Sequence, residues 1–263
     1  MVYLLKQNNM KVIALTYNYD LNKLSEIGRT WADSVYGGKD FIFEYSAASY
    51  ATFLDKNPNL VLHLYTDDVK FIKEKMSKYN VEQDRVIYYD FSPQLVKYNN
   101  GLKYSFDVLT DFIYFAKSSN EFTIKIDNDL IFNGPLPTPQ ENEVFVWKYE
   151  RKISEGNPLM GEIKVAQETL GRTDIPIYNL GVLGLPVNYP EKELREICNA
   201  MVCVDISSVT DLNTKIWHCC EQTANNWIFH KHNYKIVETH NVVSHHYDVK
   251  SKCIEQAKYL LKW

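Results

Sequence analysis

The sequence lacks the long apolar runs and the leader-like start that mark membrane and secreted proteins. It contains no stretch of about 18 apolar residues, the length that a membrane span requires. Residues 1–10 do not show a basic start followed by an apolar core, so no signal peptide is expected. Together these absences predict a cytoplasmic protein without a transmembrane segment.

An excess of basic charge and a disulfide framework are also missing. The formal net charge is -4 and the isoelectric point is about 6.0, whereas nucleic-acid binders present basic stripes. We therefore expect no nucleic-acid partner. The five cysteines, an odd number, favour a reducing compartment. Cys198, Cys203, Cys219 and Cys220, beside His218, match no zinc-knuckle or zinc-ribbon spacing, which favours ordinary thiols.

No Pro-rich, Gly-rich or highly charged linker divides the chain. With 263 residues, 45% of them hydrophobic, it can bury one substantial core. The sequence therefore predicts one domain over residues 1–263.

Strands and helices alternate through the first half of the chain. Apolar runs predict strands, and apolar positions at helical spacing predict helices around Val69, Ile72 and Met76 and over residues 105–116. The strands are expected over residues 11–15, 60–65, 85–89 and the run before Asp127. This alternation predicts an α/β fold with a mostly parallel central sheet and helices on both faces. Ligands bind beyond the carboxyl ends of such strands, where Thr16, Asp67 and Asp127 fall.

The second half is less regular. It predicts strands over residues 144–147, 177–186 and 235–237, a helix over 221–229, and an irregular approach to residues 244–248. Residues 254–263 are expected to form an amphipathic terminal helix whose apolar face packs on the core.

The most informative segment is Asp127-Asn128-Asp129, which follows an apolar strand and precedes the apolar triplet Leu130-Ile131-Phe132. Strand geometry has a period of two, which puts both carboxylates on one side. Facing carboxylates repel unless a cation lies between them, and Mg²⁺ or Mn²⁺ accepts such oxygen ligands. The alternative is a solvated acidic turn. Charges placed between two core segments favour the metal site.

Further metal and phosphate ligands are expected near the end of the chain. Six of the seven histidines lie between His218 and His246. His246, with His245 as second choice, could supply a neutral imidazole to the cation, and Lys250 and Lys252 could supply ammonium groups to phosphate.

The order of these elements and motifs resembles the GT-A glycosyltransferases, which use nucleotide sugars and carry an Asp-x-Asp metal motif. Asp127-Asn128-Asp129 matches that motif near the middle of the chain, and Asn179-Leu-Gly181 is similar to the Asn-x-Gly strand on the sugar side. Two further segments, Glu221-Gln222-Thr223-Ala-Asn225 and His246-Tyr247 with Lys250, more loosely resemble glycogenin-like and retaining galactosyltransferase-like enzymes.

The resemblance implies one GT-A domain, with a nucleotide-binding half over about residues 11–132 and an acceptor and sugar half over about 133–263. It implies a Mn²⁺-dependent or Mg²⁺-dependent transfer of a sugar from a UDP- or GDP-sugar to a hydroxyl of a glycan or glycoconjugate. Glu221 and Gln222 would act beneath the anomeric carbon. The residues expected to bind the donor are Thr16, Tyr17, Asp67, Lys103, Asn128, Asn179, Lys250 and Lys252.

Several alternatives stay open at this point. Glu221 could deprotonate the acceptor in an inverting reaction or stabilise the anomeric carbon in a retaining one. A sugar-1-phosphate nucleotidyltransferase shares the sheet and carboxylates but usually has a glycine-rich first loop, which residues 16–19 lack. A non-catalytic carbohydrate-binding or metal-binding protein could use the same aspartates for a structural ion.

Overall fold

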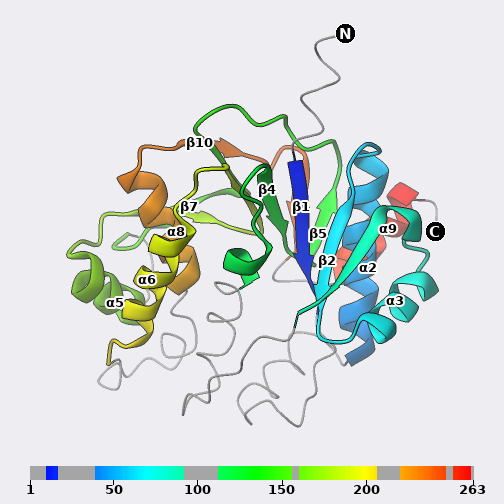
Figure 1. Ribbon diagram of the computed structural model, residues 1–263, viewed down its shortest axis with the longest axis horizontal. Helices are drawn as coiled ribbons and strands as arrows, with labels where there is room; N and C mark the ends of the chain where they lie inside the picture. Colours follow the sequence, from blue (N-terminus) through cyan, green and yellow to red (C-terminus); the bar gives the residue numbers. More distant parts are fainter. Residues whose placement is uncertain are drawn as a thin grey trace.

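A seven-stranded sheet forms the centre of the molecule (Figure 1). The computed structural model describes residues 10–16, 39–91, 112–155, 160–205, 220–246 and 251–261. The sheet contains β1 (Met10–Leu15), β2 (Leu62–Thr66), β3 (Val86–Asp90), β4 (Phe122–Ile126), β6 (Glu143–Val146), β9 (Val182–Leu185) and β10 (Lys235–Glu238). Their order is β10-β6-β9-β4-β1-β2-β3, and β9 alone among them runs against its neighbours. The predicted mostly parallel sheet is confirmed.

Helices cover both faces of this sheet, as predicted for an α/β fold (Figure 1). One group consists of α2 (Lys39–Lys56), α3 (Val69–Lys78) and α9 (Ser251–Leu261), and the other of α5 (Met160–Leu170), α6 (Glu191–Val202) and α8 (Cys220–Lys231). Within the described segments, no helix is both long and apolar enough to cross a membrane.

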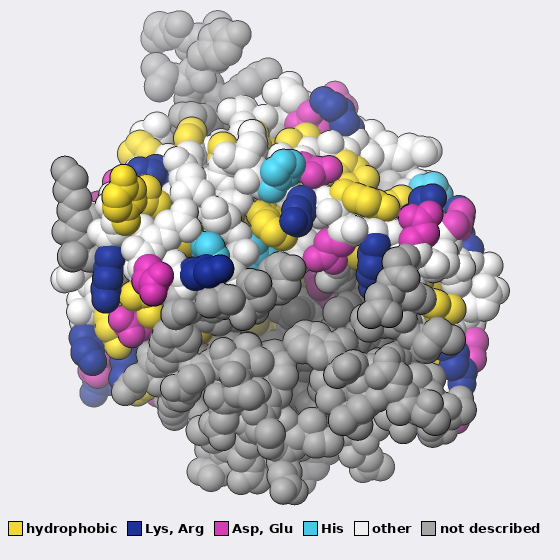
Figure 2. Space-filling view, turned by 180° about the vertical axis from the view of Figure 1, so that it is seen from behind, with side chains coloured by type: hydrophobic (Ala, Val, Ile, Leu, Met, Phe, Trp, Pro, Cys, Tyr) yellow, Lys and Arg dark blue, Asp and Glu magenta, His cyan; other side chains and the backbone are white. Residues whose placement is uncertain are grey.

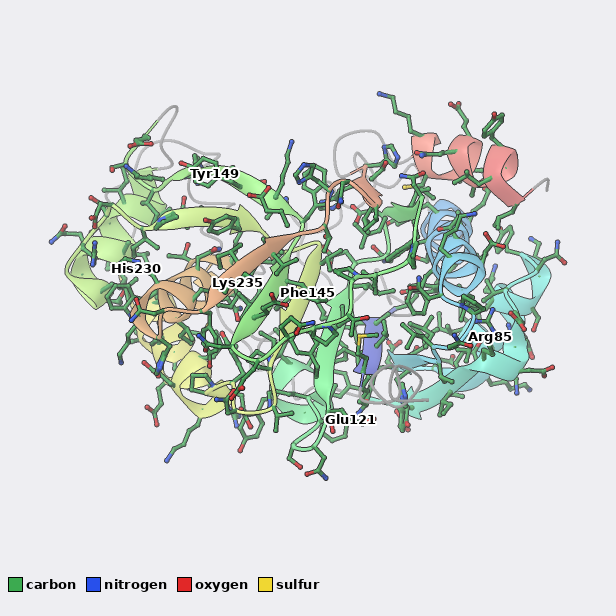
Figure 3. The ribbon with its side chains drawn as sticks, turned by 90° about the horizontal axis from the view of Figure 1, so that it is seen from above. Arg85, Glu121, Phe145, Tyr149, His230 and Lys235 are labelled. Atoms are coloured by element: carbon green, nitrogen blue, oxygen red, sulfur yellow. The ribbon has the colours of Figure 1, made fainter. Side chains whose placement is uncertain are left out.

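Alternating side chains of the strands supply the apolar cores on the two faces of the sheet. In β1, Val12 and Ala14 pack with α2, whereas Ile13 packs with Phe112 on the opposite face. Figure 3, seen from above, shows Phe145 near the centre, with Arg85 and His230 at opposite ends of the molecule.

The long helix α2 was not predicted. Buried residues surround it, because one side packs on the sheet and Tyr45 and Ala48 pack against Cys253 and Ile254 of α9. A helix buried on all sides has no polar stripe and therefore lacks the periodic pattern by which helices are recognised. The same contact confirms that the terminal helix docks on the core, although it begins earlier than predicted.

The predicted single strand over residues 177–186 is wrong, because two strands occupy it. β8 (Pro176–Asn179) pairs with β7 (Lys148–Lys152) in a small sheet, and the chain then crosses at Leu180 and Gly181 into β9 of the main sheet. A second small sheet pairs β5 (Leu130–Phe132) with β11 (Val243–His245). Both small sheets adjoin the Asp127 segment.

The surface visible in Figure 2 carries charges of both signs. Over its coloured part, Lys and Arg side chains alternate with Asp and Glu side chains and form no broad basic stripe. This mixture agrees with the expectation of no nucleic-acid partner, which stays a prediction.

Candidate active site

The two aspartates lie in a turn between two buried strands. β4 ends at Ile126 and β5 begins at Leu130, so residues 127–129 do not continue the strand as the sequence suggested. The turn nevertheless brings the carboxylates together. One ligand atom each from Asp127, Asp129 and His245 lies within 4.8 Å of the others. We call these three residues the Asp-Asp-His group.

The strand β11 delivers His245 to this group. It pairs antiparallel with β5, which sets His245 opposite Leu130 and places its Nε2 atom 3.1 Å from Asp129 Oδ1. His246 was the first choice from the sequence, but its Nε2 lies 2.8 Å from Gln256 Oε1 in α9. Because neighbouring strand residues point to opposite sides, only one of the two histidines can face the aspartates, and it is His245.

Hydrogen bonds around Asn179 fix the protonation pattern of the His245 ring. The Asn179 Nδ2 group donates to Glu150 Oε1 at 2.8 Å, and its Oδ1 accepts the N–H of Gly181 at 2.9 Å. With the amide oriented in this way, Oδ1 can only accept from His245 Nδ1, 3.0 Å away. Nδ1 therefore carries a proton, and Nε2, which faces Asp129, is the nitrogen that could bind a cation once it is deprotonated. A neutral imidazole held like this presents a lone pair to a cation.

Two neighbours define the space for the ring. A Cβ atom added at Gly181 would lie 2.8 Å from both Cε1 and Nδ1 of His245, so only glycine leaves room for the imidazole. On another side the Trp147 and His245 rings pack edge to face with their centroids 5.1 Å apart. Trp147 Nε1 donates to Val243 O at 2.8 Å. The histidine is thus held from both sides.

The donor set fits a divalent cation. Two carboxylates suit Mg²⁺ and Mn²⁺, and the imidazole shifts the preference toward Mn²⁺, since Mg²⁺ favours oxygen ligands. The tautomer of His245 fits the same role. Asp127, Asp129 and His245 are the residues that could hold such an ion.

Two buried charges lie beside the Asp-Asp-His group. Lys125 Nζ in β4 is 2.6 Å from Asp127 Oδ1 and donates to Leu180 O at 3.1 Å. Burial alone would lower the pKa of Lys125, but Asp127 and Glu221 outweigh burial and raise it. Burial raises the pKa of the Glu221 carboxyl; Lys125 opposes this rise and Asp127 adds to it. The three side chains therefore form one electrostatic unit.

Glu150 joins the two predicted sugar-side residues. Its Oε1 accepts from Asn179, and its Oε2 accepts from Gln222 Nε2 at 3.2 Å. Gln222 also donates to Tyr178 O. Glu221 is turned the other way and accepts from Asn225 Nδ2 at 3.0 Å. Gln222 and Glu221 thus lie on different sides of the α8 start: Gln222 is half-buried beside Asn179, and Glu221 is buried beside Lys125.

The remaining residues predicted to bind the donor are scattered over several elements. Thr16 follows β1, but its hydroxyl is buried and shares a 2.6 Å hydrogen bond with Tyr50. Asp67 is exposed after β2, Asn128 is half-buried in the turn, and Lys252 is exposed at the start of α9. Tyr17, Lys103 and Lys250 lie outside the described residues, and all these roles stay predictions.

Sequence reasoning missed Lys125, Glu150 and Trp147 as parts of the site, whereas Gly181 was expected on the sugar side with Asn179. Only Lys125 gave a usable signal, because a charged residue inside an otherwise apolar strand requires a buried partner. The role of Glu150 depends on the β7–β8 pairing, which no local pattern encodes.

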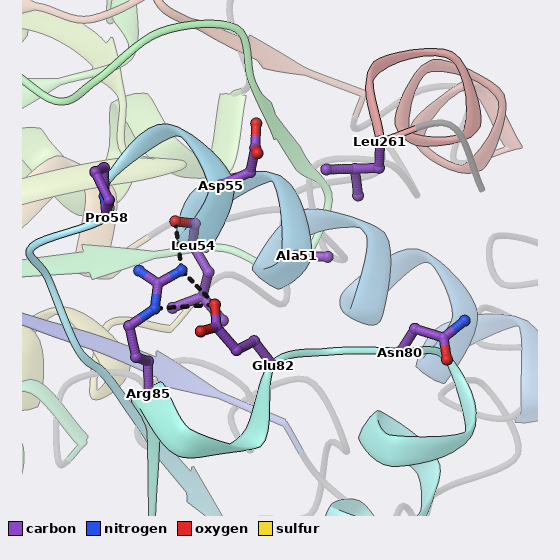
Figure 4. Close-up of a pocket in the computed structure, with 8 residues that line it drawn as sticks. All are labelled: Ala51, Leu54, Asp55, Pro58, Asn80, Glu82, Arg85 and Leu261. Atoms are coloured by element: carbon purple, nitrogen blue, oxygen red, sulfur yellow. Dashed lines mark hydrogen bonds and ion pairs between the residues drawn. The ribbon is translucent and has the colours of Figure 1, made fainter.

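A hollow next to α2 does not form part of this site (Figure 4). Its lining includes Leu54, Asn80, Glu82, Arg85 and Leu261. Arg85 fills one side of it and donates from Nη2 to Leu54 O at 2.8 Å and from Nη1 to Asn57 O at 3.1 Å. The guanidinium therefore satisfies carbonyls at the carboxyl end of α2, which is a structural role.

No protein-family model matches this sequence, and no curated protein matches it either. Among solved structures, the chain is similar to mouse xyloside xylosyltransferase 1 in its apo form, with 12% identity and a TM-score of 0.46. The match covers 88% of this chain and 84% of that one. A likeness this distant does not bear on function.

Proposed function

We propose that this protein is a metal-dependent glycosyltransferase that moves a sugar from a nucleoside-diphosphate sugar to an acceptor hydroxyl. The observation that carries the proposal is the Asp-Asp-His group at the carboxyl end of β4. In a mostly parallel sheet this edge is where ligands bind. The motif resemblance to GT-A enzymes supports the same reading.

The leaving group of such a reaction is a nucleoside diphosphate whose negative charge grows as the sugar departs. When bound by Asp127, Asp129 and His245, Mn²⁺ or Mg²⁺ would supply the charge that stabilises this group. The contacts with the sugar would come from the protein's own side chains. Asn179 and Gln222, linked through Glu150, offer polar atoms for sugar hydroxyls, and Glu221 supplies a carboxylate on the Lys125 side of the α8 start.

The first experiment asks which products form from a panel of UDP- and GDP-sugars with Mn²⁺, with Mg²⁺ and with excess chelator. A glycosyltransferase slowly releases free sugar and nucleoside diphosphate even without an acceptor. Pyrophosphate-dependent release of a nucleoside triphosphate would instead identify a nucleotidyltransferase. Metal binding without turnover of any donor would identify a non-catalytic binding protein.

The matched variants are Asp129→Asn and Asp84→Asn. The first removes a charge that the metal requires, so donor hydrolysis should fall at least about 10²-fold while the unfolding temperature without metal is kept. Asp84 is an exposed acid in the short helix η2 (Gln83–Arg85), and its variant should retain full activity. Undiminished hydrolysis by the Asp129 variant would contradict the metal role, and loss of folding would indicate a structural carboxylate.

A further inference from the structure

A lysine side chain lies within the sheet directly beneath the Asp-Asp-His group. Lys125 is 5% exposed, and its ammonium contacts Asp127 Oδ1 and Leu180 O inside the protein. Burying an ammonium is costly unless a carboxylate pairs with it closely. The pair with Asp127 meets that condition, so the lysine keeps its charge in the interior.

The position of this charge has opposite consequences for the two ligands of the proposed reaction. Coulomb energy varies with the sign of each partner, so a fixed ammonium beside Asp127 repels a divalent cation and attracts a diphosphate. Lys125 also occupies one oxygen of Asp127 that a metal could otherwise use. Glu221, buried next to this pair, interacts electrostatically with both. The ammonium thus offsets part of the negative charge that would attract a free cation.

We propose that Lys125 is a built-in counter-ion of the Asp-Asp-His group: it weakens the binding of a free divalent cation and strengthens the binding of the donor's diphosphate. The diphosphate half of this statement rests on the proposed function, whereas the cation half rests only on the Asp-Asp-His group. The consequence is that the metal binds most readily together with the nucleotide, because the diphosphate restores the negative charge that Lys125 offsets.

The test measures two affinities of Lys125→Met by calorimetry: that of Mn²⁺ without nucleotide, and that of inorganic pyrophosphate without metal. We expect Mn²⁺ to bind about tenfold more tightly and pyrophosphate about threefold to tenfold more weakly. The matched control is Lys117→Met. Lys117 also has a buried side chain but lies outside the site. Its Nζ donates to Val187 O at 2.8 Å and is 3.7 Å from Glu191 Oε2. Its variant should leave both affinities unchanged.

If the Mn²⁺ and pyrophosphate affinities change in opposite directions, the charge of Lys125 is responsible. If both affinities fall, Lys125 only holds Asp127 in place, and the proposal is overturned. If neither changes, it is overturned as well. Lys125→Arg keeps the charge and should stay within about threefold of the unaltered protein for both ligands. If the Arg and Met variants change the two affinities in the same way, the effect comes from the shape of the side chain and not from its charge.

Two further outcomes keep the proposals distinguishable. Should the Met variant fail to fold, Lys125→Gln replaces it, because glutamine keeps a hydrogen-bond donor on the side chain while lacking the charge. If the unaltered protein binds Mn²⁺ but turns over no nucleotide sugar, the proposed function fails, and the Mn²⁺ measurement still decides the role of Lys125. If it binds neither Mn²⁺ nor pyrophosphate, both proposals are overturned.

Discussion

At the scale of single residues, the site depends on which atom of His245 carries a proton. That assignment follows from a chain of donors and acceptors running from Glu150 through Asn179 to the ring. Asp127 and Asp129 could be predicted because their spacing is local. The choice between His245 and His246 could not, because it depends on the register of β11 against β5.

Gly181→Ala tests whether His245 needs the space that this glycine leaves. The new Cβ would displace the ring, and Mn²⁺ affinity should fall about 10- to 100-fold, as for other losses of metal-ligand positioning. Titration with Mn²⁺ measures this. Gly171→Ala is the control, since its φ of +70° strains the new residue but nothing lies within 4 Å of the added atom. Equal Mn²⁺ affinities in both variants would contradict the placement of His245.

Glu221→Gln separates a catalytic role from a helix-terminal one. If Glu221 acts on the anomeric carbon or the acceptor, turnover should fall about 10²- to 10⁴-fold with little change in donor affinity. A residue that only complements the helix dipole contributes about 0.3–1 kcal/mol to stability and nothing to turnover. Glu191→Gln is the matched control, because Glu191 lies in the first turn of α6 as Glu221 does in α8. Product NMR would show whether the anomeric configuration is kept or inverted.

At the scale of elements, the sequence predicted those whose pattern is local. The helix α3 is an example: Ile72 and Met76 are buried at helical spacing, and Asp68 accepts from Phe71 N at its start. Among the elements that were missed or misdivided, α2 and β8 with β9 owe their form to what packs around them, whereas α5, α6 and β7 were not predicted either. Burial on all sides removes the contrast between polar and apolar faces on which such predictions depend.

The contact between α6 and α8 should depend on pH. Glu193 accepts from Lys231 at 2.5 Å and lies 2.8 Å from His232 Nε2. Burial alone would raise the pKa of Glu193, but the hydrogen bonds from Lys231 and His232 outweigh it and lower that pKa below 4.5. A lowered carboxyl pKa stabilises the folded state above the unfolded value, and the stabilisation is lost as the pH falls through the lowered one.

Glu193→Gln should therefore lower the free energy of unfolding at pH 7 by about 0.2–1 kcal/mol, the usual range for a partly exposed pair. Urea unfolding between pH 7 and pH 3 measures this, and the difference from the unaltered protein should shrink below pH 4.5. Glu196→Gln, an exposed acid on the same helix, should change little. A difference that persists at the lowest pH would mean that the side chain acts through packing.

At the scale of the whole molecule, strands from both halves of the chain share one sheet. β4 of the first half pairs with β9 of the second in the main sheet, and β5 pairs with β11 in a separate small sheet. The alternation of elements was enough to predict this α/β architecture. The antiparallel insertion of β9 was not predictable, because strand direction within a sheet depends on the path of the connecting chain.

A ligand bound at this junction should stabilise the entire fold. At 100 times its dissociation constant, Mn²⁺ should raise the free energy of unfolding by about 2.7 kcal/mol. Thermal unfolding in a series of Mn²⁺ concentrations measures the effect, with and without UDP or GDP. The Asp129→Asn variant should show almost none of it. A gain of equal size in that variant would mean that the ion binds elsewhere.

The pairing of β5 with β11 also has a consequence for biosynthesis. Asp127 and Asp129 leave the ribosome long before His245, which completes their group. During that interval the growing chain carries two neighbouring carboxylates without their imidazole and, if Lys125 acts as inferred, already holds the ammonium that neutralises one of them. A complete metal site is therefore expected only after β11 has been synthesised and has paired with β5.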